Sequence, residues 1–194
     1  GILADAPATL LVYGMGERAI CEIAHRITSG TPANEIRDVR GTCYTMSVGE
    51  YRKSDIKGTQ LPAYPLVSEK PDFAAAWKTF SDADGIIIQP HPKTVIVQNP
   101  PAVPLSTEEM DRIYELPFAR KQHPAIKETI PALAPIQFSI ITHRGCFGAC
   151  SFCSITHHQG KRSFIYEGMV ICPAVVRLGK HHRLGKKLPW LFRI

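Results

Sequence analysis

Three cysteines in the C-terminal third of the sequence have a spacing that suits metal binding. Cys146, Cys150 and Cys153 follow a C-x₃-C-x₂-C pattern. Their thiolates are soft ligands, which favour iron–sulfur clusters or zinc. Most electron-transfer clusters are held by four cysteines, so three cysteines leave one iron without a protein thiolate. Such an open iron can bind a substrate as well as carry electrons, and we therefore predict that these cysteines hold a [4Fe–4S] cluster.

The same segment also offers a zinc alternative. Cys150 and Cys153 are followed by His157 and His158, which together could supply a Cys₂His₂ zinc set. The second hypothesis is therefore a structural zinc-binding module with a basic tail that binds nucleic acid. The identity of the bound metal separates the two hypotheses.

Small residues surround the cysteines. Gly145, Gly148 and Ala149 are predicted to let the backbone wrap closely around a cluster. Backbone N–H groups in such a loop can donate to sulfur and tune the potential of the cluster.

The elements that position this loop follow from apolar periodicity. Residues 9–13 are predicted to form a buried strand, residues 14–16 a glycine turn, and residues 17–29 an amphipathic helix. A strand over residues 42–46 completes a βαβ-like pattern, typical of an α/β layer. The predicted apolar face of the helix consists of Ala19, Ile20, Ile23, Ala24 and Ile27.

The other cysteines and glycines receive structural interpretations. Cys21 is predicted to be a core thiol on the helix face, Cys43 a strand residue, and Cys172 part of the C-terminal tail. Gly14 and Gly16 lack the full G-x-G-x-x-G pattern, so a tight strand-to-helix turn is favoured over nucleotide binding.

Further elements lead into the cysteine loop. Residues 72–80 are predicted to be helical, and residues 86–89 and 94–98 to form a hairpin. A proline-rich connector follows over residues 99–134 and contains a helix that begins at Ser106, with Glu109 completing a capping box. A strand over residues 136–141 is expected to run directly into the loop.

Composition and charge limit the classes of function. The chain has 194 residues, 44% of them hydrophobic, and a net charge of +6. Residues 161–194 hold eight Lys and Arg against one Glu, so the rest of the chain is nearly neutral and nucleic-acid binding is disfavoured. No apolar run is long enough for a membrane helix and no signal peptide is recognised, which predicts a cytoplasmic protein with no membrane partner. The sequence does not begin with Met, so we expect a fragment.

Several segments resemble the YgiQ-like proteins of the radical S-adenosylmethionine (SAM) superfamily. In the cysteine motif, aromatic Phe152 stands just before the last cysteine. The resemblance covers roughly residues 1–161 and is carried by five segments: Asp5-Ala6-Pro7, Leu11-Val12-Tyr13-Gly14-Met15-Gly16-Glu17-Arg18-Ala19-Ile20, Val97-Gln98-Asn99-Pro100-Pro101, Pro104-Leu105-Ser106-Thr107-Glu108-Glu109-Met110-Asp111 and Arg144-Gly145-Cys146-Phe147-Gly148.

The resemblance implies a specific chemistry. Cys146, Cys150 and Cys153 would hold three irons, SAM would chelate the fourth, and Phe152 would pack against the adenine. Arg144 would contact the cluster or the SAM carboxylate, or else form a salt bridge within the loop. A reductant such as flavodoxin or ferredoxin would supply an electron, and SAM would be cleaved to methionine and a 5′-deoxyadenosyl radical that abstracts hydrogen from an unidentified substrate.

The resemblance also implies an α/β architecture in four parts. Residues 1–98 would be the end of a Rossmann-like domain similar to cobalamin-binding domains, although no residue motif supports cobalamin itself. Residues 99–134 would be the connector, and residues 135–161 the first βα unit of an incomplete radical SAM (β/α) barrel. Residues 162–194 depart from the family as a basic tail, which we expect to be disordered or to arise from a frameshift. Whether this chain is an active enzyme stays open, and a degraded product that binds nothing stably is a third hypothesis.

Overall fold

The computed structural model describes residues 2–6, 8–67, 70–137, 143–148, 150 and 152–165. The chain forms two compact units. The first contains residues 1–104 together with residues 145–163, and the second contains residues 105–144 and continues from residue 164. The cysteine loop therefore belongs to the same unit as the N-terminal half of the chain.

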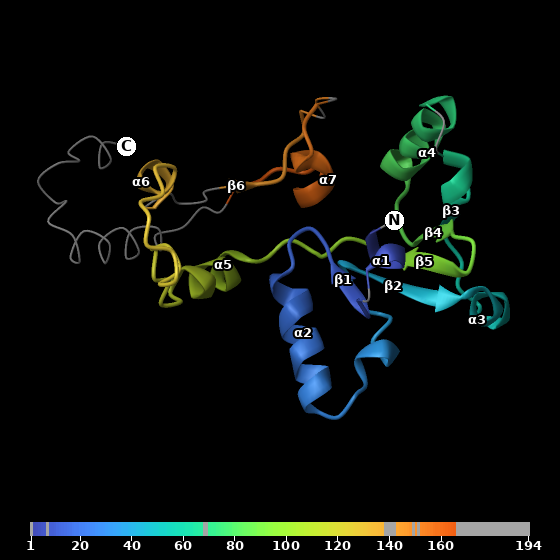
Figure 1. Cartoon of the computed structure of the whole chain (residues 1–194), viewed down its shortest axis with the longest axis horizontal. Helices are drawn as coiled ribbons and strands as arrows, with labels where there is room; N and C mark the ends of the chain where they lie inside the picture. Colours follow the sequence, from blue (N-terminus) through green and yellow to red (C-terminus); the bar gives the residue numbers. More distant parts are fainter. Residues whose placement is uncertain are drawn as a thin grey trace, which may run out of the picture. The chain divides into compact units, whose positions relative to one another are not determined.

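A five-stranded mixed sheet is the centre of the first unit (Figure 1). Its strands lie in the order β1-β2-β5-β4-β3. Three neighbouring pairs are antiparallel, and only β3 and β4 are parallel. The strands are β1 (Leu10–Val12), β2 (Thr42–Ser47), β3 (Thr59–Gln60), β4 (Ile87–Pro90) and β5 (Thr94–Gln98). The helices of this unit are α1 (Ile2–Asp5), α2 (Glu17–Thr28), α3 (Val48–Lys53), α4 (Lys70–Asp82) and α7 (Ile155–Gln159), with 3₁₀ turns at η1 (Ala33–Glu35) and η2 (Tyr64–Val67).

Strand alternation explains the main core. Tyr44 and Met46 of β2 are two residues apart, as are Val95 and Val97 of β5, so each pair points to one face of the sheet. Ile88 of β4 joins them, and all five side chains are buried in one cluster. These contacts confirm the α/β class and the predicted hairpin, since β4 pairs with β5 in antiparallel register.

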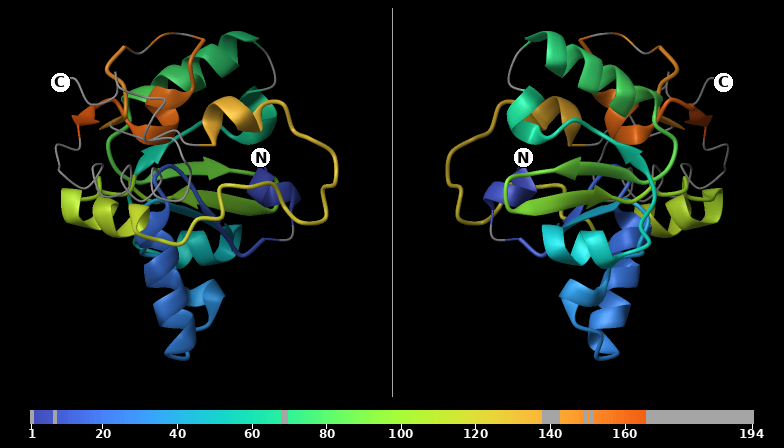
Figure 2. Two further views of the ribbon diagram at one scale, coloured as in Figure 1. Left: turned by 90° about the vertical axis from the view of Figure 1, so that its left-hand side faces the viewer. Right: turned by 90° about the vertical axis from the view of Figure 1, so that its right-hand side faces the viewer.

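The connection between β1 and β2 differs from the predicted βαβ-like pattern. A βαβ unit joins parallel strands, but β1 and β2 are antiparallel, with Val12 opposite Thr42. The physical reason is the return segment over residues 29–41, which brings the chain back after α2 to the end of the sheet that it left. There the Tyr13 N–H donates to the Gly41 carbonyl at 2.9 Å. In both Figure 1 and Figure 2, α2 projects away from the sheet.

The apolar face of α2 is narrower than predicted. Ala19 is buried and Ile23 packs beside it, against β1 and residues of the return segment. Ile20 and Ile27 are exposed, and so is Cys21, so the prediction of a core thiol at Cys21 is wrong. Two residues of an α-helix span about 200°, which turns Cys21 away from the face that Ala19 buries. Cys43 does lie in a strand, and it is buried.

Asn99 fastens the start of the connector to the sheet. Its buried side-chain amide donates to the carbonyls of Arg37 and Val39 at 2.9 and 3.1 Å and to Thr42 Oγ1 at 3.0 Å. The Tyr13 hydroxyl donates to the Asn99 carbonyl at 2.5 Å. The connector therefore leaves the sheet from a fixed point.

The second unit holds α5 (Thr107–Tyr114), α6 (Leu133–Ile136) and a two-stranded ribbon of β6 (His143–Arg144) and β7 (Phe164–Ile165). The predicted capping box is present, because the Ser106 hydroxyl accepts from the Glu109 N–H and the Glu109 carboxylate accepts from the Ser106 N–H. The predicted strand over residues 136–141 is not confirmed. Ile136 ends the helical turn of α6, and residues 138–141 lie outside the described residues, as does the tail from residue 166.

The finer architectural predictions are not confirmed by this fold. A Rossmann-like sheet is parallel, whereas the pairings here are mostly antiparallel. The described part of the chain contains only the short β6 at the place expected for a first barrel strand. Among the described residues, no helix is long and apolar enough to span a membrane.

Candidate metal centre

The cysteine loop is tied together at its base by hydrogen bonds. The Gly145 N–H donates to Gln159 Oε1 and the Cys146 N–H to the Gly160 carbonyl, both at 3.1 Å. The hydroxyl of buried Thr156 donates to the Cys146 carbonyl at 3.3 Å. Because α7 supplies Thr156 and Gln159, this short helix holds the backbone on which the first cysteine stands.

Gly145 is required at the base for a steric reason. Its φ is +79°, which favours glycine, and a Cβ built there would lie only 2.0 Å from the Arg162 carbonyl oxygen. Ser163 Oγ also donates to the Gly145 carbonyl, at 3.3 Å. The sequence predicted that Gly145 lets the loop wrap around a cluster. In the structure, its small size allows the two ends of the loop to touch.

The three cysteines of the loop are free thiols. Cys146 and Cys153 are half-buried and Cys150 is exposed. The Gly148 N–H donates to Cys146 Sγ at 3.4 Å, and Cys150 Sγ lies 3.8 Å from the Gly148 carbonyl. A Cβ at Gly148 would lie 3.4 and 3.6 Å from these two sulfurs, so the glycine separates two thiols on one short turn.

The donor set fits a thiolate-held cluster. An amide N–H already points at one sulfur, which is the kind of contact that tunes a cluster in proteins. In the described residues, however, no three Cys, His, Asp or Glu side chains converge as a site for a single ion. A cluster requires less convergence than a mononuclear ion, because each cysteine binds a different iron.

The Cys₂His₂ zinc site of the alternative hypothesis is not formed among the described residues. The His157 ring lies 4.6 Å from the Trp77 ring, and His158 is exposed. Neither histidine therefore joins Cys150 and Cys153 in a converged group.

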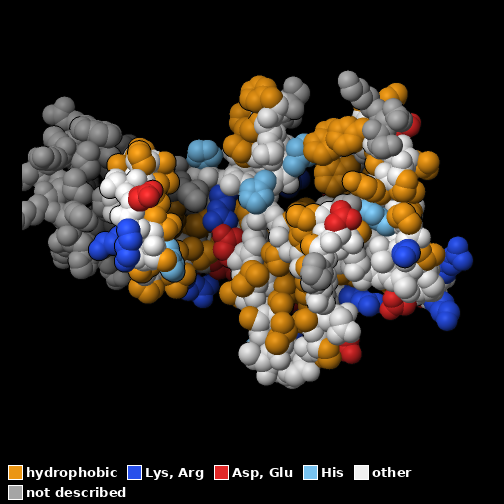
Figure 3. Space-filling view, viewed as in Figure 1, with side chains coloured by type: hydrophobic (Ala, Val, Ile, Leu, Met, Phe, Trp, Pro, Cys, Tyr) orange, Lys and Arg blue, Asp and Glu red, His pale blue; other side chains and the backbone are white. Residues whose placement is uncertain are grey.

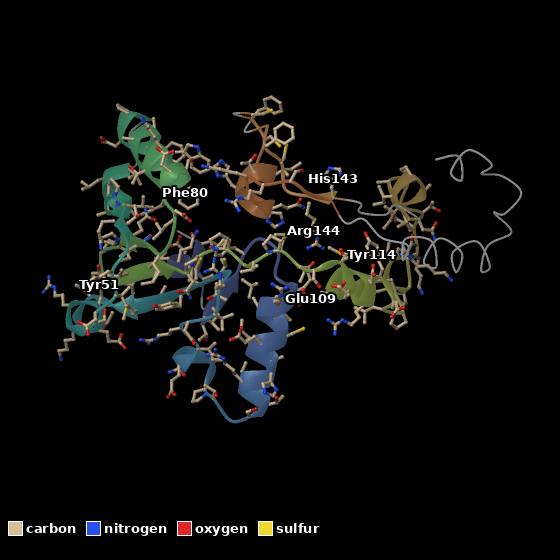
Figure 4. All side chains as sticks on the ribbon, turned by 180° about the vertical axis from the view of Figure 1, so that it is seen from behind. Tyr51, Phe80, Glu109, Tyr114, His143 and Arg144 are labelled. Atoms are coloured by element: carbon tan, nitrogen blue, oxygen red, sulfur yellow. The ribbon has the colours of Figure 1, made fainter. Side chains whose placement is uncertain are left out.

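The two residues predicted to contact cofactor lie in different settings. Phe152 is 91% exposed and Phe147 is 83% exposed, so both rings are open to a ligand or to further protein. Arg144 is half-buried in β6, which belongs to the second unit, and its backbone is paired with that of Phe164 in the ribbon. Figure 4 labels Arg144 beside His143 on this strand. Ala149 and Ser151 of the loop lie outside the described residues.

Contacts between α4 and α7 were not predicted from the sequence. Trp77 and Phe80 of α4 lie against His157, and Lys161 Nζ donates to the Ser81 carbonyl at 2.5 Å. The helical spacing of Phe73, Trp77 and Phe80 was a visible signal, but a sequence does not show which distant residue an aromatic side chain meets.

The family description "Radical SAM N-terminal" matches residues 1–139. The chain belongs to this radical SAM family. The matched relatives carry the name UPF0313 protein, and they identify the chain as YgiQ-like. The radical SAM family match ends before the cysteine loop, so the loop must be compared through these relatives.

Three relatives illustrate the likeness of this radical SAM protein to others. The UPF0313 protein of Methanocella arvoryzae is 52% identical over 167 residues, covering 82% of this chain and 27% of the relative. That of Methanosarcina acetivorans is 46% identical over 188 residues, covering 82% and 25%. That of Geobacter sulfurreducens is 43% identical over 166 residues, covering 82% and 27%. No solved structure matches the chain.

The extent of these matches bears on the loop. An uninterrupted span of 82% of the chain includes residues 146–153 wherever it begins, so the cysteine segment of this radical SAM protein lies inside each match. The chain spans about a quarter of the length of these relatives.

Proposed function

We propose that this chain carries the cluster-binding segment of a radical SAM enzyme, with Cys146, Cys150 and Cys153 as ligands of a [4Fe–4S] cluster. The observation that carries the proposal is the C-x₃-C-x₂-C loop with three free thiols, two of them on either side of Gly148. Membership of the radical SAM family agrees with it.

The residues of the loop have separate roles in this proposal. The three thiolates bind three irons, and the Gly148 N–H stabilises negative charge on Cys146 Sγ. Thr156 and Gln159 fix the backbone of Gly145 and Cys146, so the loop keeps its shape before the cofactor enters. In this proposal, Phe152 offers its exposed ring to the adenine of SAM. Arg144 contacts the cluster or the SAM carboxylate, as the family resemblance implies.

The cofactors supply the chemistry. A bound cluster, reduced by a protein such as flavodoxin or ferredoxin, would supply the electron that splits SAM into methionine and a 5′-deoxyadenosyl radical. The chain spans about a quarter of the length of its relatives, and its residues assign no substrate. The start of a barrel over residues 135–161 and a cytoplasmic location are likewise proposals. The mostly antiparallel sheet of the first unit does not support the Rossmann-like, cobalamin-binding architecture.

Anaerobic reconstitution tests the proposal. The chain is loaded with iron and sulfide, reduced with dithionite, and examined by EPR with and without SAM. We expect about four iron atoms per chain and a [4Fe–4S]⁺ signal that changes when SAM is added. The signal should be lost in each of the variants Cys146→Ala, Cys150→Ala and Cys153→Ala. It should be kept in Cys21→Ala, which removes an exposed thiol that is distant in sequence from the loop.

Other outcomes would point elsewhere. A cluster signal that is indifferent to SAM would support the cysteine assignment but contradict SAM binding by this chain. Stoichiometric zinc and no cluster would overturn the proposal in favour of the zinc module.

A further inference from the structure

An aromatic ridge runs along α4. Phe73, Trp77 and Phe80 are spaced four and three residues apart, so they share one side of the helix. Ring centroids are 6.1 Å apart between Phe73 and Trp77 and 5.6 Å apart between Trp77 and Phe80. Phe73 is 57% exposed and Trp77 is 46% exposed, although large aromatic side chains usually contribute to a core. Figure 3 shows hydrophobic side chains gathered on α4.

The helix that follows the cysteine loop rests on this ridge. The His157 ring lies 4.6 Å from the Trp77 ring at an interplanar angle of 59°, and 6.1 Å from the Phe80 ring. Figure 4 shows Phe80 at the end of α4 that lies nearest α7. His157 comes 80 residues after Trp77 in the sequence, so this contact closes a long loop of chain.

Two further contacts hold α7 and the residues that follow it. Lys161 Nζ donates to the Ser81 carbonyl, next to Phe80 on α4. On another side, the turn at Gly14 comes so close to α7 that a Cβ there would lie 2.9 Å from the His158 carbonyl oxygen. Gly14 also has a φ of +69°, so both its backbone conformation and the close approach require glycine.

The contacts connect directly to the cysteines. His157 contacts the exposed ridge through its ring. The residue before it in the sequence, Thr156, donates a hydrogen bond from its hydroxyl to the Cys146 carbonyl. Since α7 is only five residues long, a movement of His157 must also move Thr156 and Gln159.

We propose that Trp77 and Phe80, the two residues of the ridge that contact His157, position the cysteine loop, with Trp77 as a positioning residue that acts through His157 and α7. In this proposal, α4 supports the cysteine loop that would hold the metal. The nature of the bound group rests on the proposed function, but the docking of the loop can be tested without any metal.

The test measures thiol reactivity in the metal-free 194-residue chain. Alkylation of each cysteine by iodoacetamide is followed by mass spectrometry, with exposed Cys21 as an internal reference. Trp77→Ala and His157→Ala should each speed the alkylation of half-buried Cys146 and Cys153 by roughly two- to tenfold, the range of an aromatic contact. The double variant should be no faster than either single variant, because both remove the same contact.

Matched variants keep the test specific. Phe73→Ala removes an aromatic ring from the same ridge, one turn before Trp77, and should leave both alkylation rates unchanged. Trp77→Phe keeps a ring at the contact and should restore near wild-type rates even if Trp77→Ala folds poorly. Equal acceleration by Phe73→Ala and Trp77→Ala, or multiplicative effects in the double variant, would overturn the proposal.

A parallel reconstitution separates this inference from the proposed function. If the wild-type chain binds no iron–sulfur cluster but shows the expected alkylation pattern, the proposed function fails and the positioning role stands. If a cluster forms and Trp77→Ala leaves the alkylation rates unchanged, the positioning role fails and the proposed function stands.

Discussion

At the scale of single residues, Gly145 and Gly160 show how one loop uses glycine in two ways. Gly145 has a φ of +79° and its missing Cβ would strike the Arg162 carbonyl. Gly160 has a φ of +97° but open space where a Cβ would stand. The first glycine therefore satisfies both a backbone conformation and a close contact, and the second satisfies a backbone conformation alone.

This difference predicts unequal effects of the same substitution. Gly160→Ala should cost about 1–3 kcal/mol of unfolding free energy from backbone strain. Gly145→Ala should cost more, because Arg162 must also move away, and it should reduce the iron bound per chain. Urea denaturation and iron analysis of both variants check this, and equal values for the two would show that the contact with Arg162 has no energetic weight.

Asn99 gives a second prediction at this scale. Its amide donates to two carbonyls and one hydroxyl in a buried place, so Asn99→Asp replaces donors with an oxygen that faces other oxygens. We expect a loss of at least about 1–3 kcal/mol, the cost of leaving buried polar groups unpaired. Asn99→Ala should cost less than Asn99→Asp in urea denaturation, and the reverse order would contradict the role of the amide.

At the scale of elements, local signals were predictive, including those of the β4–β5 hairpin, whereas contacts across long connections were not. Ser106 and Glu109 identified the start of α5 because a capping box depends on residues three apart in sequence. The direction of β2 against β1 was predicted wrongly, because it depends on the path of residues 29–41, which carry no strong periodicity. The contact of His157 with Trp77 of α4 was not predicted, because no local sequence pattern encodes a contact between residues 80 positions apart.

The capping box of α5 can be tested directly. Ser106→Ala removes the acceptor of the Glu109 N–H and should cost about 1 kcal/mol. Hydrogen exchange of the first amides of α5 should speed up accordingly, while Thr107→Ala, one residue on, should have little effect. An unchanged exchange rate in Ser106→Ala would mean that the packing of Leu105 and Met110 alone holds the helix.

At the scale of the whole molecule, a buried thiol and a half-buried phenol make the unfolding free energy depend on pH in the alkaline range. Burial raises the pKa of the Cys43 thiol to about 12, from 9.0. Burial likewise raises the pKa of the Tyr13 hydroxyl to about 12, from 10.0. A raised pKa in the folded state means that the associated stability is fully present below the unfolded pKa and is lost as the pH rises towards the folded pKa.

Unfolding free energy should therefore fall as the pH rises from 9.0 towards about 12. Cys43→Ala should lower the slope of this fall by the share of one proton, whereas Cys21→Ala, at an exposed thiol, should keep the wild-type slope. Urea denaturation across this pH range gives both slopes. Identical slopes in the wild type and Cys43→Ala would show that the Cys43 thiol is not protected by the fold.

The unit that contains both the sheet and the cysteine loop yields the last prediction. A group that binds only the folded chain stabilises it by mass action, by about 2.7 kcal/mol when its concentration is a hundred times Kd. Because α7 contacts α4 and the turn at Gly14, cluster assembly should raise the melting temperature of the sheet as well as order the loop. Circular dichroism during heating, with and without the reconstituted cluster, measures this shift, and the triple variant Cys146→Ala, Cys150→Ala, Cys153→Ala should show none. A loaded chain whose sheet melts at the temperature of the metal-free chain would show that the loop is energetically separate from the N-terminal half, despite the contacts that join them.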